Sequence, residues 1–275
     1  MTRQGNRRRT GRLNGLTIRL LIAAAIAAFS LITYFSSGSV NPVTGEKQHV
    51  RISSDQEIAM GVNAAPSMAQ QYGGLHPDQK AQAFVKRVGQ RIIANSSAKD
   101  SPYNYQFHLL ADNRTINAFA LPGGQVFITA ALLSKLESEA QLAGILGHEI
   151  GHVIGRHGAE HMAKQKLTQG LISAVGVGTD PNLGRMAASV GQLINMKYGR
   201  NDELEADEFG IVLMSEAGYD PRAMIGVMDI LESTSGGARQ PEIMSSHPNP
   251  GNRREQIKVT IGKIFPNGVP NGLIP

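Results

Sequence analysis

Apolar and polar residues follow one another along the chain in patterns that predict both helices and strands. Apolar positions recur at helical spacing over 78–95, which predicts an amphipathic helix. An earlier helix is predicted over 53–73, with a serine as its N-terminal cap. Residues 103–112 alternate between polar and apolar and predict a strand, and residues 117–133 predict two more strands joined by a Pro-Gly-Gly turn.

The second half of the chain predicts further helices. Ser138 and Gln141 fit a capping box, in which each side chain bonds the backbone of the other, and they begin a helix that runs through 144–157. Residues 201–218 predict another helix. Between the two, residues 167–199 are apolar and rich in glycine, and they predict two helices joined by a turn.

The N-terminal region predicts attachment to a membrane. Leu20 to Phe35 form a run without a charged residue, close to the length that a membrane span needs. Six arginines and no acidic residue lie in the first 45 residues. Arginines keep the end that they flank in the cytoplasm, so the bulk of the chain is expected across the membrane. The alternative is a signal peptide that is cleaved near Ser37 and Ser39.

Charge and cysteine content narrow the possible functions. The net charge of +5 comes from those arginines, because without them the remainder is slightly negative. The folded part therefore gives no indication of binding to nucleic acid. The chain has no cysteine, so a metal ion would have to be held by His, Asp or Glu.

The sequence GHEIGH carries the strongest chemical signal. His148 and His152 are four residues apart, so on a helix both imidazoles lie on one face, about 6 Å apart, as a zinc site requires. Glu149 is placed to take a proton from a metal-bound water as the general base. The alternative is an ordinary buried helix with three polar side chains. It is disfavoured because burying these groups without partners or a metal costs several kcal/mol.

Catalytic zinc needs a third protein ligand, and the segment ELEAD supplies carboxylates. Glu203 and Asp207 share a helix face, so Glu203 can bind the metal while Asp207 accepts a hydrogen bond from the far nitrogen of a ligand histidine. Glu205 lies on another face, and we interpret it as a solvated acidic residue. On a continuous helix His157 is rotated by about 140° from the second ligand. We therefore interpret His157 and His161 as structural or surface residues.

Together these motifs resemble the HtpX and CAAX prenyl protease family of zinc metallopeptidases. HEIGH is followed about fifty residues later by ELEAD and then by SHPNPGNRR, and NPVTGEKQ, NAFALPGGQVFIT and YGRNDELEADEFG also resemble that family. The resemblance implies an α+β fold, mainly α-helical and zincin-like, with a small β-sheet next to the active-site helix. It also implies one zinc ion (Zn2+) per chain. The residues that it implies for the site are the zinc ligands His148, His152 and Glu203, the general base Glu149, and Asp207 behind a ligand histidine.

The resemblance also assigns roles outside these motifs. In such enzymes an edge strand pairs with the backbone of the substrate. The strand expected in that position consists of Gln125, Val126, Phe127, Ile128 and Thr129. His247 matches a C-terminal histidine of the family, which could donate to the developing oxyanion or close the site by taking the fourth position on zinc. Arg253 follows at the usual spacing, whereas Arg254 stands where the family more often has an aliphatic residue.

These observations predict a zinc metalloendopeptidase that acts on unfolded, misfolded or membrane-associated proteins. We expect a single pass through the inner (cytoplasmic) membrane with the catalytic domain facing the periplasm, or release into the periplasm after signal cleavage. One alternative is a chaperone-like binding protein with a latent or structural zinc site, and another is a scaffold that shapes membranes. Residues 167–199 are expected to cover the cleft. The expected division is a basic cytoplasmic tail (1–19), a membrane anchor or signal segment (20–36), a linker (37–52) and the metallopeptidase domain (53–275).

Overall fold

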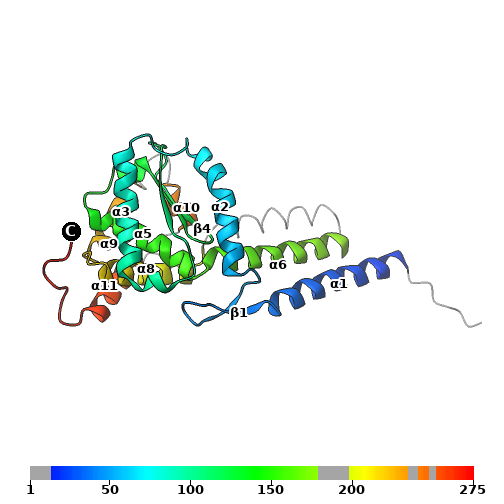
Figure 1. Cartoon of the computed structure of the whole chain (residues 1–275). Coiled ribbons are helices and arrows are strands. Elements are labelled where there is room, and N and C mark those ends of the chain that lie inside the picture. The colour runs from blue at the N-terminus through cyan, green and yellow to red at the C-terminus, as the bar shows by residue number, and fades with distance from the viewer. Residues whose placement is uncertain (1–13, 179–197, 235–240, 248–251) are drawn as a thin grey trace, which may run out of the picture. The chain divides into compact units, whose positions relative to one another are not determined.

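The chain forms two compact units. The computed structural model describes residues 14–178, 198–234, 241–247 and 252–275 (Figure 1). The first unit is Met1–Ser36 with Lys164–Ile194, and the second is Ser37–Ala163 with Asn195–Pro275. All the residues that the sequence nominates for the site lie in the second unit. Most of the cover expected over the cleft falls in 179–197, outside the described residues.

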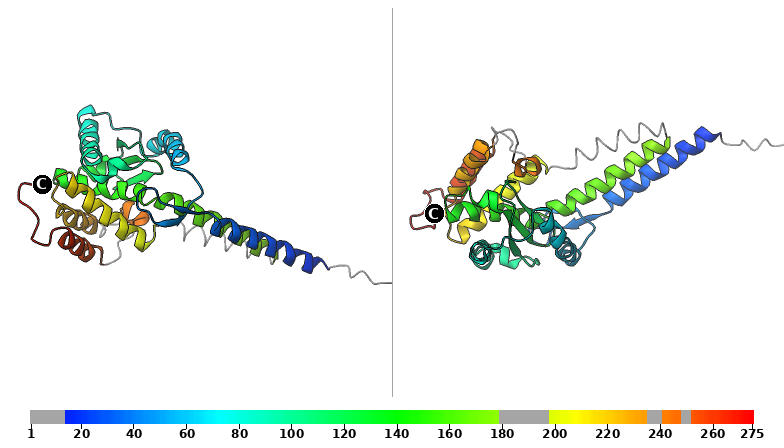
Figure 2. Two further views of the ribbon diagram at one scale, coloured as in Figure 1. Left: turned by 60° about the horizontal axis from the view of Figure 1, so that its bottom comes forward. Right: turned by 90° about the horizontal axis from the view of Figure 1, so that it is seen from above.

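The first unit contains the apolar N-terminal helix. This helix, α1 (Gly15–Phe35), is long and apolar enough to cross a membrane, and none of its residues is buried. Helix α6 (His157–Gly178) contributes its residues from Lys164 onward to the same unit. The two helices lie side by side in this unit (Figure 2), where a Cβ added at Gly170 would overlap the Ser30 hydroxyl. By length and composition, α1 is a candidate membrane anchor.

The second unit packs helices around a small sheet (Figure 1). Its helices are α2 (Ser54–Gln71), α3 (Gln79–Asn95), the short α4 (Ala130–Leu133), α5 (Glu139–Ile154), the first residues of α6, α8 (Arg200–Glu216), α9 (Ala223–Thr234), the short α10 (Ile243–Ser246) and α11 (Arg253–Ile264), with a 3-10 turn at Ser97–Asp100. Helix α5 contacts α3, α8, α9 and the sheet, and it is buried from Ala140 to Ile154. The fold is thus α+β and mainly helical, which confirms the sequence-based expectation.

Helix starts follow the caps in the sequence. The Ser53 hydroxyl accepts a hydrogen bond from the Gln56 backbone N–H, and the Gln56 side chain accepts one from the Ser53 backbone N–H, so α2 begins with a complete capping box. At α5, Ser138 accepts from the backbone of Gln141 as expected. The Gln141 side chain instead accepts from the backbone N–H of Glu137, at 2.6 Å. The start of α5 is therefore fixed one residue further back than the capping box predicts.

The sheet has three strands in the order β3-β5-β4. Strand β5 (Gln125–Thr129) is parallel to β3 (Gln106–Leu110) and antiparallel to β4 (Ala118–Leu121). All five residues of β5 are buried. The expectation that Gln125–Thr129 form an edge strand open to substrate is therefore wrong, because neighbouring strands already occupy both sides of its backbone. Among the described strands, the free edge on that side of the sheet belongs to β4.

The segment after α1 is a packed hairpin rather than a linker. Strand β1 (Gly38–Val40) pairs antiparallel with β2 (Lys47–His49), and both belong to the second unit. Two side chains of this hairpin donate to the last carbonyls of α5: Asn41 to Ile154 at 2.8 Å and Gln48 to Gly155 at 2.5 Å. The expected boundaries of 37–52 as a linker are thus corrected, since this segment caps the helix that carries the two histidines.

Candidate metal centre

Helices α5 and α8 cross at small residues, and this crossing builds the site. A Cβ added at Gly151 would lie 2.9 Å from the carbonyl oxygen of Ala206, and one added at Gly210 would lie 3.0 Å from the backbone nitrogen of His148. The two backbones therefore touch without side chains between them. This close approach places the carboxylates of α8 against the histidines of α5.

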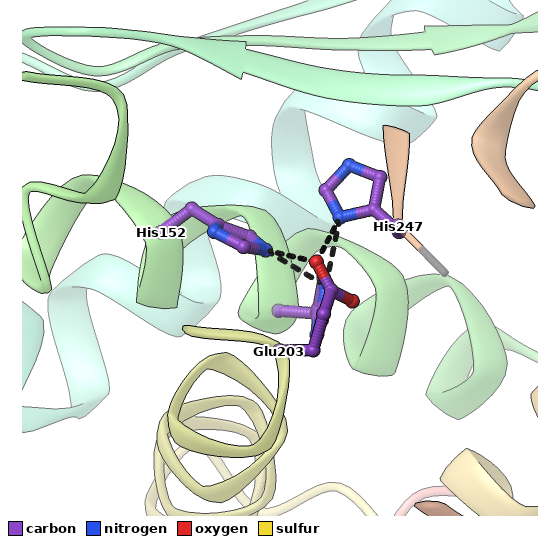
Figure 3. A group of neighbouring side chains, drawn as sticks. His152, Glu203 and His247 are labelled. Carbon is purple, nitrogen blue, oxygen red and sulfur yellow. Dashed lines mark hydrogen bonds and ion pairs between the residues drawn. The ribbon is translucent and has the colours of Figure 1, made fainter. Parts of the chain in front are cut away.

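Four buried side chains converge at the crossing, and Figure 3 labels three of them, His152, Glu203 and His247. The four are His148 and His152 from α5, Glu203 from α8 and His247 just after α10, and one ligand atom from each lies within 4.8 Å of the others. Both α5 histidines turn Nε2 inward, with the two nitrogens 3.1 Å apart. The structure thus brings together the three ligands proposed from the sequence. Three imidazoles and one carboxylate are a donor set that suits zinc.

His247 lies among these ligand atoms. Its Nδ1 is 3.0 Å from an oxygen of Glu203 and 3.4 Å from Nε2 of His148. Its other nitrogen, Nε2, faces Glu149 at 3.7 Å. Of the two roles that the sequence leaves open, this arrangement matches the one in which His247 takes the fourth position on the metal.

The charge of the site calls for a cation. Glu149 is 0% exposed, and neither of its carboxylate oxygens has a hydrogen-bond partner among the described residues. Glu203 and Asp207 are also buried, and the buried cation beside them is Arg253. With neutral imidazoles, these groups leave an excess of two negative charges in a buried site, which is costly without compensation. The residues therefore fit a divalent metal ion.

The surroundings keep Glu203 and His152 in the states that bind metal. Burial alone would raise the pKa of Glu203, but its contacts with the rings of His152 and His247 outweigh burial and hold that pKa far below its ordinary value. Burial lowers the pKa of His152 well below the usual value, so this imidazole is neutral. Metal ligands must be an ionised carboxylate and neutral imidazoles, and these shifts favour both at Glu203 and His152. At His247 burial alone would lower the pKa, but the charge of Glu149 and the hydrogen bond with Glu203 raise it, which favours the protonated ring until a metal binds.

Asp207 and Arg253 support the first histidine. Nδ1 of His148 lies 2.9 Å from Oδ1 of Asp207, the contact expected from the spacing of ELEAD. Arg253 donates to the same carboxylate through Nε and Nη2, at 2.8 and 2.6 Å, and its Nη1 lies 3.0 Å from Glu203. Arg254, which stands where the family more often has an aliphatic residue, points instead to Asp229 and Glu232 of α9 and is partly exposed.

His157 and Glu205 lie next to the site, although neither belongs to the group of converging ligand atoms. His157 is 2% exposed, and its Nδ1 lies 2.9 Å from Nδ1 of His152. Its Nε2 lies 3.2 Å from Glu205. The predicted rotation of His157 away from His152 assumed one continuous helix, but α5 ends at Ile154 and a new helix begins at His157. His161 lies further along α6, with its ring 6.0 Å from that of Tyr198.

Two cavities adjoin the metal centre. One, of about 330 Å³, opens beside Glu149 and His247, and its apolar wall consists of Ile145, Met224, Val227, Met228, Leu231 and Ile243. The other, of about 230 Å³, lies between the end of β4 and the ring of Tyr198, which stacks on His152 with 4.2 Å between ring centroids. His148, His152 and His247 therefore each line one of these two pockets.

A buried helix with two histidines and a free carboxylate, crossed by a helix that supplies a third ligand, is the arrangement of a zincin-type metallopeptidase. The chain belongs to peptidase family M48, whose family model matches residues 79–261. The resemblance to the HtpX and CAAX prenyl proteases is thereby confirmed, since they form the same family.

Individual relatives span bacteria and mitochondria. The chain is 30% identical over 265 residues to the Beta-barrel assembly-enhancing protease of Escherichia coli (strain K12), covering 90% of this chain and 53% of that protein. It is 29% identical to the Mitochondrial metalloendopeptidase OMA1 of Schizosaccharomyces pombe, covering 86% and 70%, and 32% identical to Metalloendopeptidase OMA1, mitochondrial, of Bos taurus, covering 82% and 46%. The chain thus spans about half the length of the Escherichia coli relative.

Proposed function

We propose that the protein is a zinc-dependent endopeptidase in which His148, His152 and Glu203 hold the metal and Glu149 is the general base. Two observations together support this proposal. Four metal-ligand atoms converge, and beside them the carboxylate of Glu149 is fully buried and has no hydrogen-bond partner among the described residues. When bound, zinc supplies Lewis acidity to the scissile carbonyl and to the attacking water.

Glu149 moves the proton of this reaction. Its carboxylate accepts a proton from water as the water oxygen forms a bond to the carbonyl carbon. Glu149 then delivers that proton to the amine nitrogen as the C–N bond breaks. The burial of this carboxylate excludes bulk water, which strengthens its interaction with the reacting groups.

The free edge of β4 is the place where a substrate backbone can pair. The carbonyl of Asn117 accepts from the N–H of Thr129 at 3.0 Å, and bonded pairs in an antiparallel ladder alternate. The peptide groups of Ala118 and Ala120 therefore point away from β5. The end of β4 and His152 line the same cavity. Pairing through backbone groups tolerates many sequences, which supports extended, unfolded polypeptides as substrates.

The apolar cavity beside Glu149 supports a preference for exposed hydrophobic side chains. Its wall from α9 and α10 is aliphatic and sulfur-containing, and such a wall binds leucine-like or aromatic residues. Misfolded and membrane-associated proteins expose these residues in extended segments. Together with α1, this favours a protease of protein quality control at a membrane, with its catalytic domain in the periplasm.

A chaperone-like binding protein is the second candidate. The position of His247 among the ligand atoms favours it, because a fourth protein ligand leaves no position for water. In that case the protein would hold unfolded chains along β4 without cutting them.

Zinc content and casein cleavage of the full chain in detergent separate these candidates. The endopeptidase predicts one zinc per chain in both the wild type and Glu149→Gln, with cleavage at least about 100-fold slower in the variant. Glu208→Gln, an exposed glutamate on α8, is the matched control and should cleave normally. Zinc without cleavage in the wild type would favour the binding protein. A wild type that binds no zinc would contradict both.

A further inference from the structure

His152 contacts a second histidine, His157, which has no role in the proposed reaction. Its Nε2 faces the other ligands, 3.4 Å from Glu203. Its Nδ1 faces the opposite way and lies 2.9 Å from Nδ1 of His157. The two rings meet edge to face, with 4.9 Å between centroids. His157 is therefore placed to hold the orientation of the ligand ring.

The hydrogen-bond pattern follows from the need to bind a metal. Nε2 of His152 must present a lone pair to the metal, so the ring proton of a neutral His152 sits on Nδ1. That Nδ1–H donates to Nδ1 of His157, which must then carry its own proton on Nε2. This second proton donates to the carboxylate of Glu205, 3.2 Å away. Each ring nitrogen of His152 and His157 thus acts either as a donor or as an acceptor, without conflict.

The break between α5 and α6 makes this contact possible. Arg156 has a φ of 56°, in the left-handed region that non-glycine residues rarely occupy. The turn redirects the chain so that the ring of His157 folds back over Gly155, where a Cβ would overlap it. Arg156 is held in place by Glu57, at 3.0 Å from its Nε, and by the carbonyl of Ile52, at 2.6 Å from its Nη2. The backbone is thus fixed in the conformation that delivers His157 to His152.

We propose that His157 is a positioning residue for the metal ligand His152, and that Glu205 in turn positions His157. This series of hydrogen bonds has the same purpose as the contact between Asp207 and Nδ1 of His148, which orients the other histidine of α5. The two supports differ in exposure, since the side chain of Asp207 is 4% exposed and that of Glu205 is 33% exposed. The partly solvated Glu205 is therefore the weaker link, and its loss should matter less than the loss of His157.

Zinc affinity of the full chain in detergent tests this proposal, which rests on the proposed zinc site. The dissociation constant is measured by competition with a chromophoric chelator. His157→Phe keeps an aromatic ring and removes both nitrogens, and we expect its zinc affinity to fall by roughly 10- to 100-fold. His157→Asn places an amide oxygen near the position of Nδ1, so it should recover part of the loss. Glu205→Gln should weaken binding less than His157→Phe.

Controls separate positioning from a general loss of structure. Glu208→Gln is matched to Glu205→Gln on the same helix, and His108→Phe is matched to His157→Phe in a half-buried position away from the site. Both should bind zinc as the wild type does. The absorption of the Co(II)-loaded protein should change in His157→Phe and return toward the wild-type spectrum in His157→Asn, because it reports the geometry of the ligands. If His157→Phe does not fold, His157→Asn should still bind zinc more tightly than His157→Gln, whose amide cannot occupy the Nδ1 position.

Unchanged zinc affinity and Co(II) absorption in His157→Phe would overturn the proposal, as would equal affinities of the Asn and Gln variants. The same preparations show whether the proposed function fails separately. A wild type that binds zinc without cleaving casein contradicts the endopeptidase, while the affinity series still tests His157.

Discussion

Arg253 donates two hydrogen bonds from its guanidinium group to the carboxylate of Asp207, at 2.8 and 2.6 Å, and both side chains are buried next to His148. Replacing Arg253 with methionine would leave Asp207 and Glu203 buried without this cation. We expect the variant to lose about 3–5 kcal/mol of unfolding free energy, because breaking one side of a buried ion pair strands the other charge. Denaturation followed by circular dichroism, on metal-free protein, measures this loss.

The neighbouring arginine is the natural control for that experiment. Arg254 pairs with Asp229 and Glu232 on the surface, and its side chain is 35% exposed. Arg254→Met should therefore change stability by no more than about 1 kcal/mol. Equal losses in the two variants would show that the buried contact with Asp207 contributes nothing beyond an ordinary surface ion pair.

His247→Ala should bind zinc less tightly and cleave faster. Nδ1 of His247 lies with the ligand atoms, so removing it deletes one ligand and frees a position for water. If the site is closed by His247 in about nine molecules of ten, kcat/KM rises about ten-fold when the residue is removed. Cleavage of casein at saturating zinc measures the change. A large fall in kcat at full zinc occupancy would assign His247 to oxyanion stabilisation instead.

Removing the metal should destabilise the wild type more than it destabilises Glu149→Gln. Zinc at 1,000 times its dissociation constant stabilises a folded chain by about 4 kcal/mol. Without it the buried carboxylates lose their compensating charge, and Glu149 has no hydrogen-bond partner among the described residues. Metal-free Glu149→Gln should therefore be more stable than metal-free wild type, by about 1–3 kcal/mol. Thermal unfolding with and without a chelator tests this, and a less stable variant would contradict the charge argument.

Gly151→Ala should weaken zinc binding because it pushes α8 away from α5. The added methyl would lie 2.9 Å from the carbonyl oxygen of Ala206, and overpacking of this kind costs about 1–3 kcal/mol. Glu203 then moves relative to His152, so zinc affinity should fall as well. On α11, Gly262 has no atom within 4 Å of an added Cβ, and Gly262→Ala should stabilise the helix slightly. Normal zinc affinity in Gly151→Ala would show that the crossing tolerates a wider separation.

The proposed ligands could be predicted from the sequence because their placement depends on local helical geometry. His148 and His152 share a face of one helix, and Glu203 and Asp207 share a face of another, whatever the rest of the fold does. Only the meeting of the two helices is a tertiary event. It depends on glycines at 147, 151 and 210, but glycine also occurs in helices at kinks and near helix ends. These three residues alone therefore do not predict the crossing.

The sequence-based predictions were wrong where the backbone departs from regular helical geometry or where strands pair with strands distant in the sequence. The position of His157 depends on one left-handed residue, Arg156, whose side chain gives no local signal for that conformation. The central place of β5 depends on its pairing with β3, and strand order is not encoded in alternation of residues. A glycine directly before Arg156 was the available hint that the helix ends there.

The hairpin of β1 and β2 sets where a recombinant fragment of the catalytic domain can begin. A fragment that starts at α2 would lose Asn41 and Gln48, and with them the donors to the carbonyls of Ile154 and Gly155. Each buried carbonyl left without a donor costs about 1–3 kcal/mol, and both lie at the end of the histidine-bearing helix. A fragment that starts at Ser37 keeps them. The stretch that resembles a flexible tether therefore belongs to the smallest portion of the chain that is expected to keep the proposed metal site intact.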